Sequence, residues 1–279
     1  MILAVAMTVP VGAAGARAPG TRPDAAENAR ARRPMPRLPD PVDCPGCWHP
    51  GLQTSWQWQL TGTLDTSVDV QAYDIDLFEH AAGVVADLHA DGRQVVCYMS
   101  AGSVEKWRPD AGSFPPRVIG KGLDGWPGER WLDVRKRHVL RPIMQARVDL
   151  CAQGGFDGIE FDNVDAWSND SGFPLARADQ LRYNVMLANM AHTAGLSALM
   201  KNDVEQVKQL LPYFDMHLDE QCFQYNECDR LLPFIVAGKP VFEVEYGLDT
   251  SGFCPDANAM NFNSMKKKLN LGVWREPCR

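Results

Sequence analysis

The sequence predicts one (β/α)8 barrel that follows a leader and a linker, and three observations predict it. From Trp56 onward, short β-rich runs alternate with longer segments whose apolar residues recur every three or four positions. Eight such runs are present, which is the number of strands in this barrel. The region that carries them, residues 44–279, is close to the length of about 250 residues at which this barrel folds as one domain.

Composition and charge are those of a globular protein with an acidic surplus. Hydrophobic residues make up 45% and charged residues 23% of the 279 residues, so a disordered or collagen-like chain is excluded. The net charge of -7 argues against a nucleic-acid partner. After the N-terminus no apolar run reaches the about 18 residues of a membrane span. Eight cysteines favour an exported protein. We expect a monomer.

The N-terminal residues predict an export signal and a tether. Residues 1–16 are apolar and end in the A-x-A pattern of a signal peptide, although no Lys or Arg precedes the apolar run. Residues 17–43 are rich in Ala, Arg and Pro and lack apolar periodicity, which predicts a disordered linker. Its acidic residues alternate with its arginines, which favours a solvated tether over a polyanion-binding arm. The remaining 22 basic and 31 acidic residues give the core a net charge near -9. We expect a secreted, extracellular protein.

The barrel elements follow from the hydrophobic patterns. The predicted strands are Trp56–Leu60, Val68–Asp74, Val95–Ser100, Gly158–Asp162, Ser197–Lys201, Met216–Glu220, Pro240–Glu245 and Asn270–Trp274. The predicted helices are Ile75–Ala90, Arg135–Gln153, Arg177–Ala194, Asp203–Leu211, Asp229–Ala237 and Asp256–Leu269. Only about seven residues separate the first two strands, too few for a helical crossover, so we expect the first βα helix to be reduced to a short loop. A doubly wound open sheet is the alternative, but no predicted strand leads directly into a Gly-rich phosphate turn.

Carboxylates collect where the predicted strands end, which is where barrels place catalytic groups. Because side chains alternate along a strand, Glu220 falls at the rim above Met216 and Leu218, and Asp162 falls at the rim with Glu160 one layer below it. Two facing carboxylates are the requirement of glycoside hydrolysis. We therefore expect Asp162 and Glu220 to be catalytic. For Glu160 we weigh pairing with Lys201 equally with catalysis, for Asp203 we favour a helix N-cap, and for Asp76 the two functions are balanced.

Four segments carry a family resemblance: residues 56–78, 95–110, 155–167 and 218–228. They resemble glycoside hydrolase family 114, the endo-α-1,4-polygalactosaminidases, over nearly all of residues 52–275. The resemblance implies a secreted (β/α)8 enzyme that cleaves α-1,4-linked galactosamine-containing polysaccharide. It assigns Asp162 as nucleophile and Glu220 as acid/base, with retention of configuration. In one departure, Glu160-Phe161-Asp162 stands where the family pattern is Asp-x-Asp.

Further residues near the strand ends are candidates for contact with the sugar. They are Tyr73, Asp74, Tyr98, Trp167, Asn202, Gln221, Glu243 and Glu245. A polymer of galactosamine and N-acetylgalactosamine is cationic where it is not acetylated, so the acidic members of this set would attract it. The segment 101–133 shows no strong helical pattern and carries Trp107, Trp126 and Trp131, which could stack on sugar rings. In the first strand we expect the glutamines to face inward and the tryptophans to pack under helices.

The cysteines predict disulfides rather than a metal site. We expect Cys222 to pair with Cys228, Cys254 with Cys278, and Cys44 with Cys47 in a structural bridge. For Cys97 and Cys151 the sequence leaves open two buried thiols or a bridge between strand and helix. A single C-x-x-C and no H-x-x-x-H spacing argue against zinc, so we expect no metal and no cofactor.

The sequence also allows two other functions. A barrel glycosidase of another specificity, such as an α-galactosidase, would share this fold, because fold does not fix substrate. A carbohydrate-binding barrel that has lost catalysis is the second, and the presence of both Asp162 and Glu220 argues against it.

Overall fold

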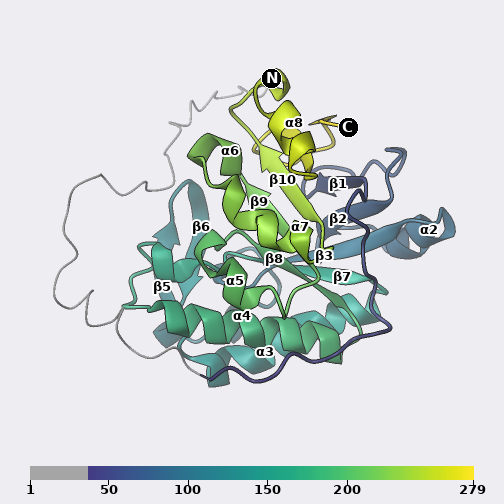
Figure 1. Cartoon of the computed structure of the whole chain (residues 1–279). Coiled ribbons are helices and arrows are strands. Elements are labelled where there is room, and N and C mark those ends of the chain that lie inside the picture. Colours follow the sequence, from purple (N-terminus) through teal and green to yellow (C-terminus); the bar gives the residue numbers. More distant parts are fainter. Residues whose placement is uncertain (1–36) are drawn as a thin grey trace, which may run out of the picture.

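The computed structural model describes residues 37–279, and these form a barrel-shaped sheet surrounded by helices (Figure 1). The sheet has nine strands in the order β1-β2-β3-β7-β8-β9-β10-β11-β12. The first eight pair in parallel, and β12 is antiparallel to β11. The predicted (β/α)8 class is therefore confirmed. The predicted signal peptide and most of the predicted linker lie outside the described residues.

The sheet strands alternate with helices in the manner of a barrel. The strands are β1 (Trp56–Gln59), β2 (Ala72–Asp76), β3 (Gln94–Ser100), β7 (Gly158–Asp162), β8 (Ser197–Lys201), β9 (Met216–Glu220), β10 (Val241–Glu245), β11 (Asn263–Lys267) and β12 (Arg275–Pro277). The α-helices are α2 (Val84–Ala90), α3 (Arg137–Gln153), α4 (Arg177–Thr193), α5 (Val207–Leu210), α6 (Cys222–Tyr225), α7 (Leu232–Val236) and α8 (Thr250–Ala259). Short 3-10 turns η1 (Ala111–Ser113), η2 (Pro116–Val118), η3 (Ala166–Ser168), η4 (Val204–Gln206) and η5 (Cys228–Leu231) lie in the connections.

Side-chain alternation separates an inner and an outer apolar cluster. The inner one fills the barrel with Trp56, Trp58, Ala72, Val96, Leu199, Met216, Leu218, Phe242, Val244, Met265 and Leu271. Trp56 packs on Phe242 at 4.9 Å between ring centroids. The expectation for the first strand was thus wrong, because the tryptophans fill the interior while Gln57 donates outward to the Val273 carbonyl at 2.8 Å. Large rings suit this position because the neighbouring strands contribute small residues such as Ala72.

Several element boundaries differ from the predictions, and the predicted helix Asp256–Leu269 is divided between α8, which ends at Ala259, and β11. β2 extends to Asp76, whose carboxylate accepts the Phe78 and Glu79 N–H groups and so ends the strand in a turn. The helix that follows begins only at Val84, after a left-handed Gly83. The eighth strand of the barrel is β11, and the predicted strand 270–274 is a connection that leads to β12. No helix lies between β1 and β2, as expected.

Residues 101–133 fold into a second sheet rather than a loop. Strands β4 (Ser103–Glu105), β5 (Ile119–Leu123) and β6 (Trp126–Leu132) pair antiparallel in the order β4-β6-β5. This sheet stands between β3 and α3, on the side of the barrel where the strands end (Figure 1). It therefore adds a wall beside the predicted site.

The barrel is not closed by a strand ladder. The two terminal parallel strands, β1 and β11, do not pair with each other. The Trp56 indole N–H instead crosses to the Asn263 carbonyl at 2.8 Å, and the Leu60 N–H reaches the Leu271 carbonyl at 2.9 Å. The C-terminal residues cover the outer side of this seam. The gap between β1 and β11 is therefore shielded by the C-terminal segment and not by a helix.

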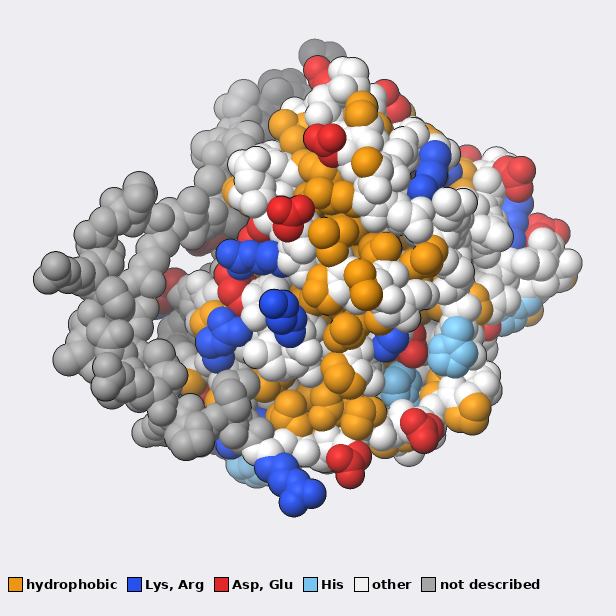
Figure 2. Space-filling view, in the orientation of Figure 1, with side chains coloured by type: hydrophobic (Ala, Val, Ile, Leu, Met, Phe, Trp, Pro, Cys, Tyr) orange, Lys and Arg blue, Asp and Glu red, His pale blue; other side chains and the backbone are white. Residues whose placement is uncertain are grey.

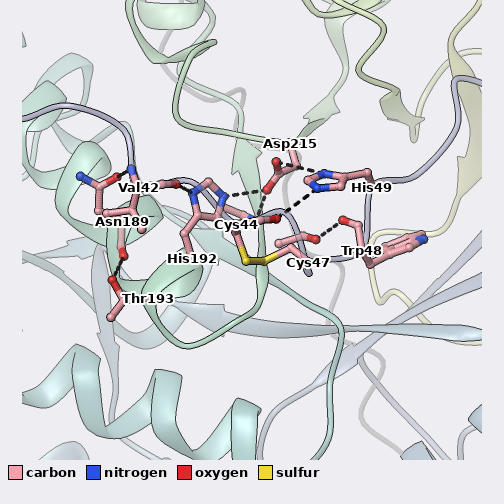
Figure 3. Close-up of a disulfide and its surroundings, with 11 residues drawn as sticks. Val42, Cys44, Cys47, Trp48, His49, Asn189, His192, Thr193 and Asp215 are labelled. Atoms are coloured by element: carbon pink, nitrogen blue, oxygen red, sulfur yellow. Dashed lines mark hydrogen bonds and ion pairs between the residues drawn. A yellow bond between two sulfur atoms is a disulfide. The ribbon is translucent and has the colours of Figure 1, made fainter.

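Residues 37–49 lie against the N-terminal end of the barrel, although 37–43 were expected to belong to the linker. His192 of α4 links this strap to the barrel: its Nδ1 lies 2.9 Å from the Val42 carbonyl, and its Nε2 lies 2.8 Å from the carboxylate of Asp215, directly before β9 (Figure 3). The Cys44–Cys47 bridge closes a tight loop beside them (Figure 3). The strap therefore seals the end of the barrel opposite the predicted site.

The helical face in Figure 2 carries apolar side chains near its centre, around α7, with charges of both signs about them. Val236 at the end of α7 is 87% exposed.

Within residues 37–279 no helix is long and apolar enough to cross a membrane.

All four predicted or open cysteine pairs are bridged in the structure. Cys222–Cys228, Cys254–Cys278 and Cys44–Cys47 confirm the expectations. The question left open for Cys97 and Cys151 is answered by a bridge that ties β3 to α3 across a separation of 54 residues.

We predict that the Cys97→Ala/Cys151→Ala double variant loses stability by about 2–5 kcal/mol, because a long closed loop restricts the unfolded chain strongly. The Cys44→Ala/Cys47→Ala variant is the matched control, since its separation of 3 residues restricts the chain little. Urea unfolding of both variants measures the difference. Equal losses in the two variants would contradict the loop-length account.

Candidate active site

A buried ammonium group, that of Lys201, joins three carboxylates at the C-terminal ends of neighbouring strands. Its Nζ lies 2.9 Å from Asp162 Oδ1, 3.0 Å from Glu160 Oε1 and 3.2 Å from Glu220 Oε2. The same Nζ lies 4.7 Å from the centroid of the Trp58 ring, which forms the floor below it. Lys201 is 1% exposed, so this charge exists only because the carboxylates compensate it.

The sheet register brings these groups together. In β7 the inward side is Gly158, Glu160 and Asp162, which places Asp162 at the rim and Glu160 one layer below it. Lys201 ends β8 beside β7 and β9 and pairs in register with Leu218, two residues before Glu220. The predicted proximity of Asp162 and Glu220 is thus present in the structure, and so is the predicted pairing of Glu160 with Lys201.

Asp162 is surrounded by hydrogen-bond donors. Tyr98 donates its hydroxyl to Asp162 Oδ2 at 2.8 Å, and the Asn163 N–H donates to Oδ1 at 2.8 Å. Lys201 supplies a third donor to Oδ1. Asp162 is therefore held by donors on both of its oxygens while its side chain remains 16% exposed.

Glu220 has a different set of partners. Its Oε1 accepts the Tyr246 hydroxyl, and its Oε2 accepts the Asn202 amide at 3.3 Å. The side-chain oxygen of Asn202 in turn accepts a hydrogen bond from the Glu220 backbone N–H at 3.0 Å. Asn202 adopts a left-handed φ of 47°, which lets its short polar side chain reach the next strand. Glu220 is 24% exposed and is thus open to a ligand.

Charge and burial shift the protonation of the surrounding groups. Burial would lower the pKa of Lys201, but Asp162, Glu160 and Glu220 raise it well above its ordinary value. Burial also raises the pKa of Glu160, to about 6, against the opposing charge of Lys201. Deeper in the barrel, burial and then the Glu160 charge raise the pKa of Asp74 well above its ordinary value. Protonated Asp74 therefore lies beneath ionised Glu160.

The antiparallel sheet contributes further acidic groups beside the rim. Asn163 donates its amide to Glu129 of β6 at 2.9 Å, and Ser103 of β4 donates its hydroxyl to the same carboxylate. Burial, with a smaller contribution from the charge of Asp162, raises the pKa of Glu129 to about 7. Arg108 forms an ion pair with Asp76. From the sequence, a helix N-cap and a functional group were balanced alternatives for Asp76.

Several predicted sugar contacts lie at this end of the barrel. Tyr98 and Asn202 touch Asp162 and Glu220 directly, and Asp74 lies inside the barrel below them. Trp167 follows β7 and donates its indole N–H to Asp203 at 2.9 Å. Asp203 occupies the expected N-cap position, before η4, but its side chain makes no cap bond.

Tyr73, Glu243 and Glu245 do not face the barrel interior, and these three expectations need correction. Tyr73 belongs to the outer apolar cluster and donates its hydroxyl to the Val68 carbonyl at 2.6 Å. Along β10 the inward positions are Phe242 and Val244, so both glutamates point outward. Glu245 accepts the first N–H groups of α6, and both oxygens of Glu243 are buried without a hydrogen-bond partner.

Gln221 comes directly after Glu220 but turns away from the ion cluster. Its backbone has a left-handed φ of 67°, and its side-chain amide donates to Gln224 at 3.1 Å at the start of α6. It is thus a partly exposed rim residue in this structure and makes no contact with Asp162 or Lys201.

The sequence did not indicate Tyr246 as a site residue, and it indicated Lys201 only as a partner of Glu160. Strand alternation through Leu199 places Lys201 inward, so the signal was present in β8. Tyr246 continues the inward side of β10, after Phe242 and Val244, and would have been found if the apolar positions had been assigned to the interior. In residues 37–279 no group of three or more His, Cys, Asp or Glu side chains has a geometry that could hold a metal ion.

A parallel barrel with paired carboxylates at its strand ends is the arrangement of barrel glycoside hydrolases. The model of glycoside-hydrolase family GH114 matches residues 41–279, so the chain belongs to this family. The resemblance seen in the sequence is thereby confirmed, and the chain is a glycoside hydrolase by its family.

Solved structures and one curated relative extend this comparison. The structure of Aspergillus fumigatus Ega3 in complex with galactosamine has 38% sequence identity and a TM-score of 0.81, and covers 86% of this chain and 100% of that chain. The glycoside hydrolase domain of PelA from Pseudomonas aeruginosa shares the fold, with 12% identity, a TM-score of 0.61, and coverage of 79% and 96%. An uncharacterized protein of Deinococcus radiodurans is 26% identical over 180 residues, which span 56% of this chain and 57% of that protein.

We predict that Lys201→Met destabilises the protein by about 3–5 kcal/mol at neutral pH, because it leaves buried carboxylates without a counter-charge. Lys201 lowers the pKa of Glu160, which burial raises to about 6, so its removal raises that pKa further. The loss should therefore shrink as the pH falls toward 6, because Glu160 of the variant already takes up a proton above that pH.

The control for this prediction is Lys266→Met, whose partner Asp249 is exposed and whose loss should cost under about 1 kcal/mol. Urea unfolding at several pH values measures both variants. A loss for Lys201→Met that is as small as the control, or that is the same at every pH, would contradict the counter-charge account.

Proposed function

We propose that this protein is a secreted endo-hydrolase of α-1,4-linked galactosamine-containing polysaccharide that retains anomeric configuration. Asp162 is the nucleophile and Glu220 is the acid/base. The single observation that carries the proposal is the pair of partly exposed carboxylates bridged by Lys201 on strands β7 and β9.

Asp162 suits the role of nucleophile because its partners stabilise its negative charge. Lys201, Tyr98 and the Asn163 N–H all donate to it. In the first step an Asp162 oxygen bonds to the anomeric carbon as the glycosidic bond breaks. The leaving sugar oxygen takes a proton from Glu220, which thereby becomes the carboxylate.

Glu220 then acts as the base in the second step. It removes a proton from a water molecule, whose oxygen attacks the anomeric carbon and releases Asp162. The Tyr246 hydroxyl and the Asn202 amide hold the Glu220 carboxyl in one orientation through both steps. Burial and then the Glu220 charge raise the pKa of Tyr246 well above its ordinary value, so Tyr246 remains a donor.

The distance between the carboxylates supports retention. Lys201 Nζ lies 2.9 Å from an Asp162 oxygen and 3.2 Å from a Glu220 oxygen, so these two oxygens are at most about 6 Å apart. Retaining enzymes place their carboxyl groups about 5–5.5 Å apart, whereas inverting enzymes need about 6.5–9.5 Å to admit a water molecule. The upper limit here is shorter than the inverting range.

The charge of the site supports a cationic sugar polymer as substrate. The Ega3 structure that resembles this chain holds galactosamine, an amino sugar. Glu129 and Asp165 add acidic groups beside Asp162, and the chain as a whole carries a net charge of -7. Trp107 and Trp126 are each 47% exposed on the antiparallel sheet segment and offer faces for sugar stacking. Four disulfides support a location outside the cell.

We expect Asp162→Asn and Glu220→Gln each to abolish hydrolysis of partly deacetylated galactosaminogalactan while the protein stays folded. Each change removes a charge or a proton that the reaction requires. The matched control is Glu243→Gln, which alters a buried carboxyl on the outer side of β10 and should keep activity. Chromatography of the released oligosaccharides and circular dichroism measure activity and fold. Turnover near the wild-type level in either catalytic variant would refute the assignment.

We expect the first product to carry the α-configuration at its new reducing end. Proton NMR of the anomeric signals, recorded before mutarotation, measures it. Initial release of the β-anomer would mean inversion and would rule out a covalent intermediate on Asp162.

A further inference from the structure

The seam between β1 and the C-terminal residues holds a cavity that the proposed reaction does not use. Its volume is ≈130 Å³, and its lining includes Ser55, Asn263, Ser264, Arg275 and Arg279. None of the residues of the Lys201 ion cluster lines it. The cavity is thus separate from the candidate active site.

One polar group at this cavity is buried without a partner. Arg275 Nε is buried and has no hydrogen-bond acceptor. Buried donors in proteins are nearly always satisfied by protein, water or a ligand. An acceptor inside the cavity would satisfy it.

The arginines of the cavity are also uncompensated in charge. Within residues 37–279 neither Arg275 nor Arg279 lies within ion-pair distance of a carboxylate. Arg279 donates only to neutral oxygens, including the Asn263 side chain at 2.9 Å. The charge of Arg275 also acts on a neighbouring group, because burial and then this charge lower the pKa of Lys267 to about 7. Such an accumulation is unexpected in a chain with a net charge of -7.

The acidic group nearest to Ser264 in the sheet does not cancel these charges. Glu243 pairs in register with Ser264. Burial, and then the neighbouring Glu245, raise the pKa of Glu243 well above its ordinary value, which favours its uncharged form. The cavity therefore remains cationic.

We propose that this cavity binds a small oxyanion of the phosphate class, with Arg275 and Arg279 as its charged ligands. Guanidinium groups match the oxygens of such anions in geometry and charge. A water molecule would satisfy one donor but would leave both positive charges uncompensated. The bound anion would join the C-terminal strand to the start of β1, where the barrel has no ladder of its own.

Titration calorimetry of the full chain with inorganic phosphate tests the proposal, together with thermal unfolding in phosphate and in sodium chloride of equal ionic strength. We expect saturable binding and a higher Tm in phosphate, because a ligand that binds only the folded state stabilises it. Arg275→Gln and Arg279→Gln should each weaken binding at least about tenfold. The matched control is Arg141→Gln, an exposed α3 arginine without an ion pair, which should bind phosphate like the wild type.

Acetate provides a second arm of the same experiment. Binding of phosphate more tightly than acetate would support the proposed class of anion, whereas binding of acetate alone would overturn it. If Arg275→Gln does not fold, Arg279→Gln decides, since its side chain is exposed near the chain end. Absence of binding to both anions, equal Tm values in phosphate and chloride, or unchanged affinity in Arg279→Gln would overturn the proposal.

Discussion

Carboxylates from β7 and β9 compensate the charge of the Lys201 ammonium group, and this compensation stabilises the end of the barrel at which the strands end. An unpaired charge at this depth would oppose folding by several kcal/mol, so Lys201, Glu160 and Asp162 are stable only together. Trp58 forms the apolar floor that keeps water from the ammonium group from below. The same contacts place two partly exposed carboxylates opposite each other. The same contacts of Lys201 therefore balance the buried charges and set the geometry of the proposed reaction.

The N-terminal end of the barrel and the seam beside β1 have other roles. The strap of residues 37–49 seals the N-terminal end through His192, Asp215 and a short disulfide loop. The seam beside β1 is bridged by single hydrogen bonds and by the C-terminal strand, where the cations of the oxyanion cavity lie. Negative charge thus gathers at the rim and positive charge at the seam. This separation suits a cationic polymer at one place and a small anion at another.

Much of the barrel was predictable because its central strands have one clear inward side. In β8 and β9 the apolar residues and the rim groups fall on the same parity, and in β7 Glu160 and Asp162 share one parity, so Asp162 and Glu220 followed from alternation alone. β10 was ambiguous, because Val241 shares a side with Glu243 while Phe242 and Val244 share the other, and only packing against Trp56 decides between them. Lys201 was seen as a partner of Glu160, but its contact with all three carboxylates depends on the register between strands.

Other elements carried weak local signals. β11 contains a single strongly apolar residue, Met265, and forms a strand because it completes the sheet beside β10. The antiparallel sheet of residues 103–132 contains several glycines and a proline, which weaken the strand pattern in the sequence. The tryptophans of β1 were misplaced because no helix covers that strand, so the usual division between interior and helix-facing sides did not apply. Tertiary packing, rather than local propensity, decided each of these cases.

Mass spectrometry of the protein after reaction with an activated fluoro-sugar of galactosamine, whose glycosyl ester hydrolyses slowly, tests the central claim most directly. The account predicts one covalent sugar per chain, carried by Asp162, because Lys201, Tyr98 and Asn163 stabilise its charge for attack. The Asp162→Asn variant should form no adduct. An adduct on Glu220 or on another residue, or hydrolysis of the reagent without any adduct, would contradict it.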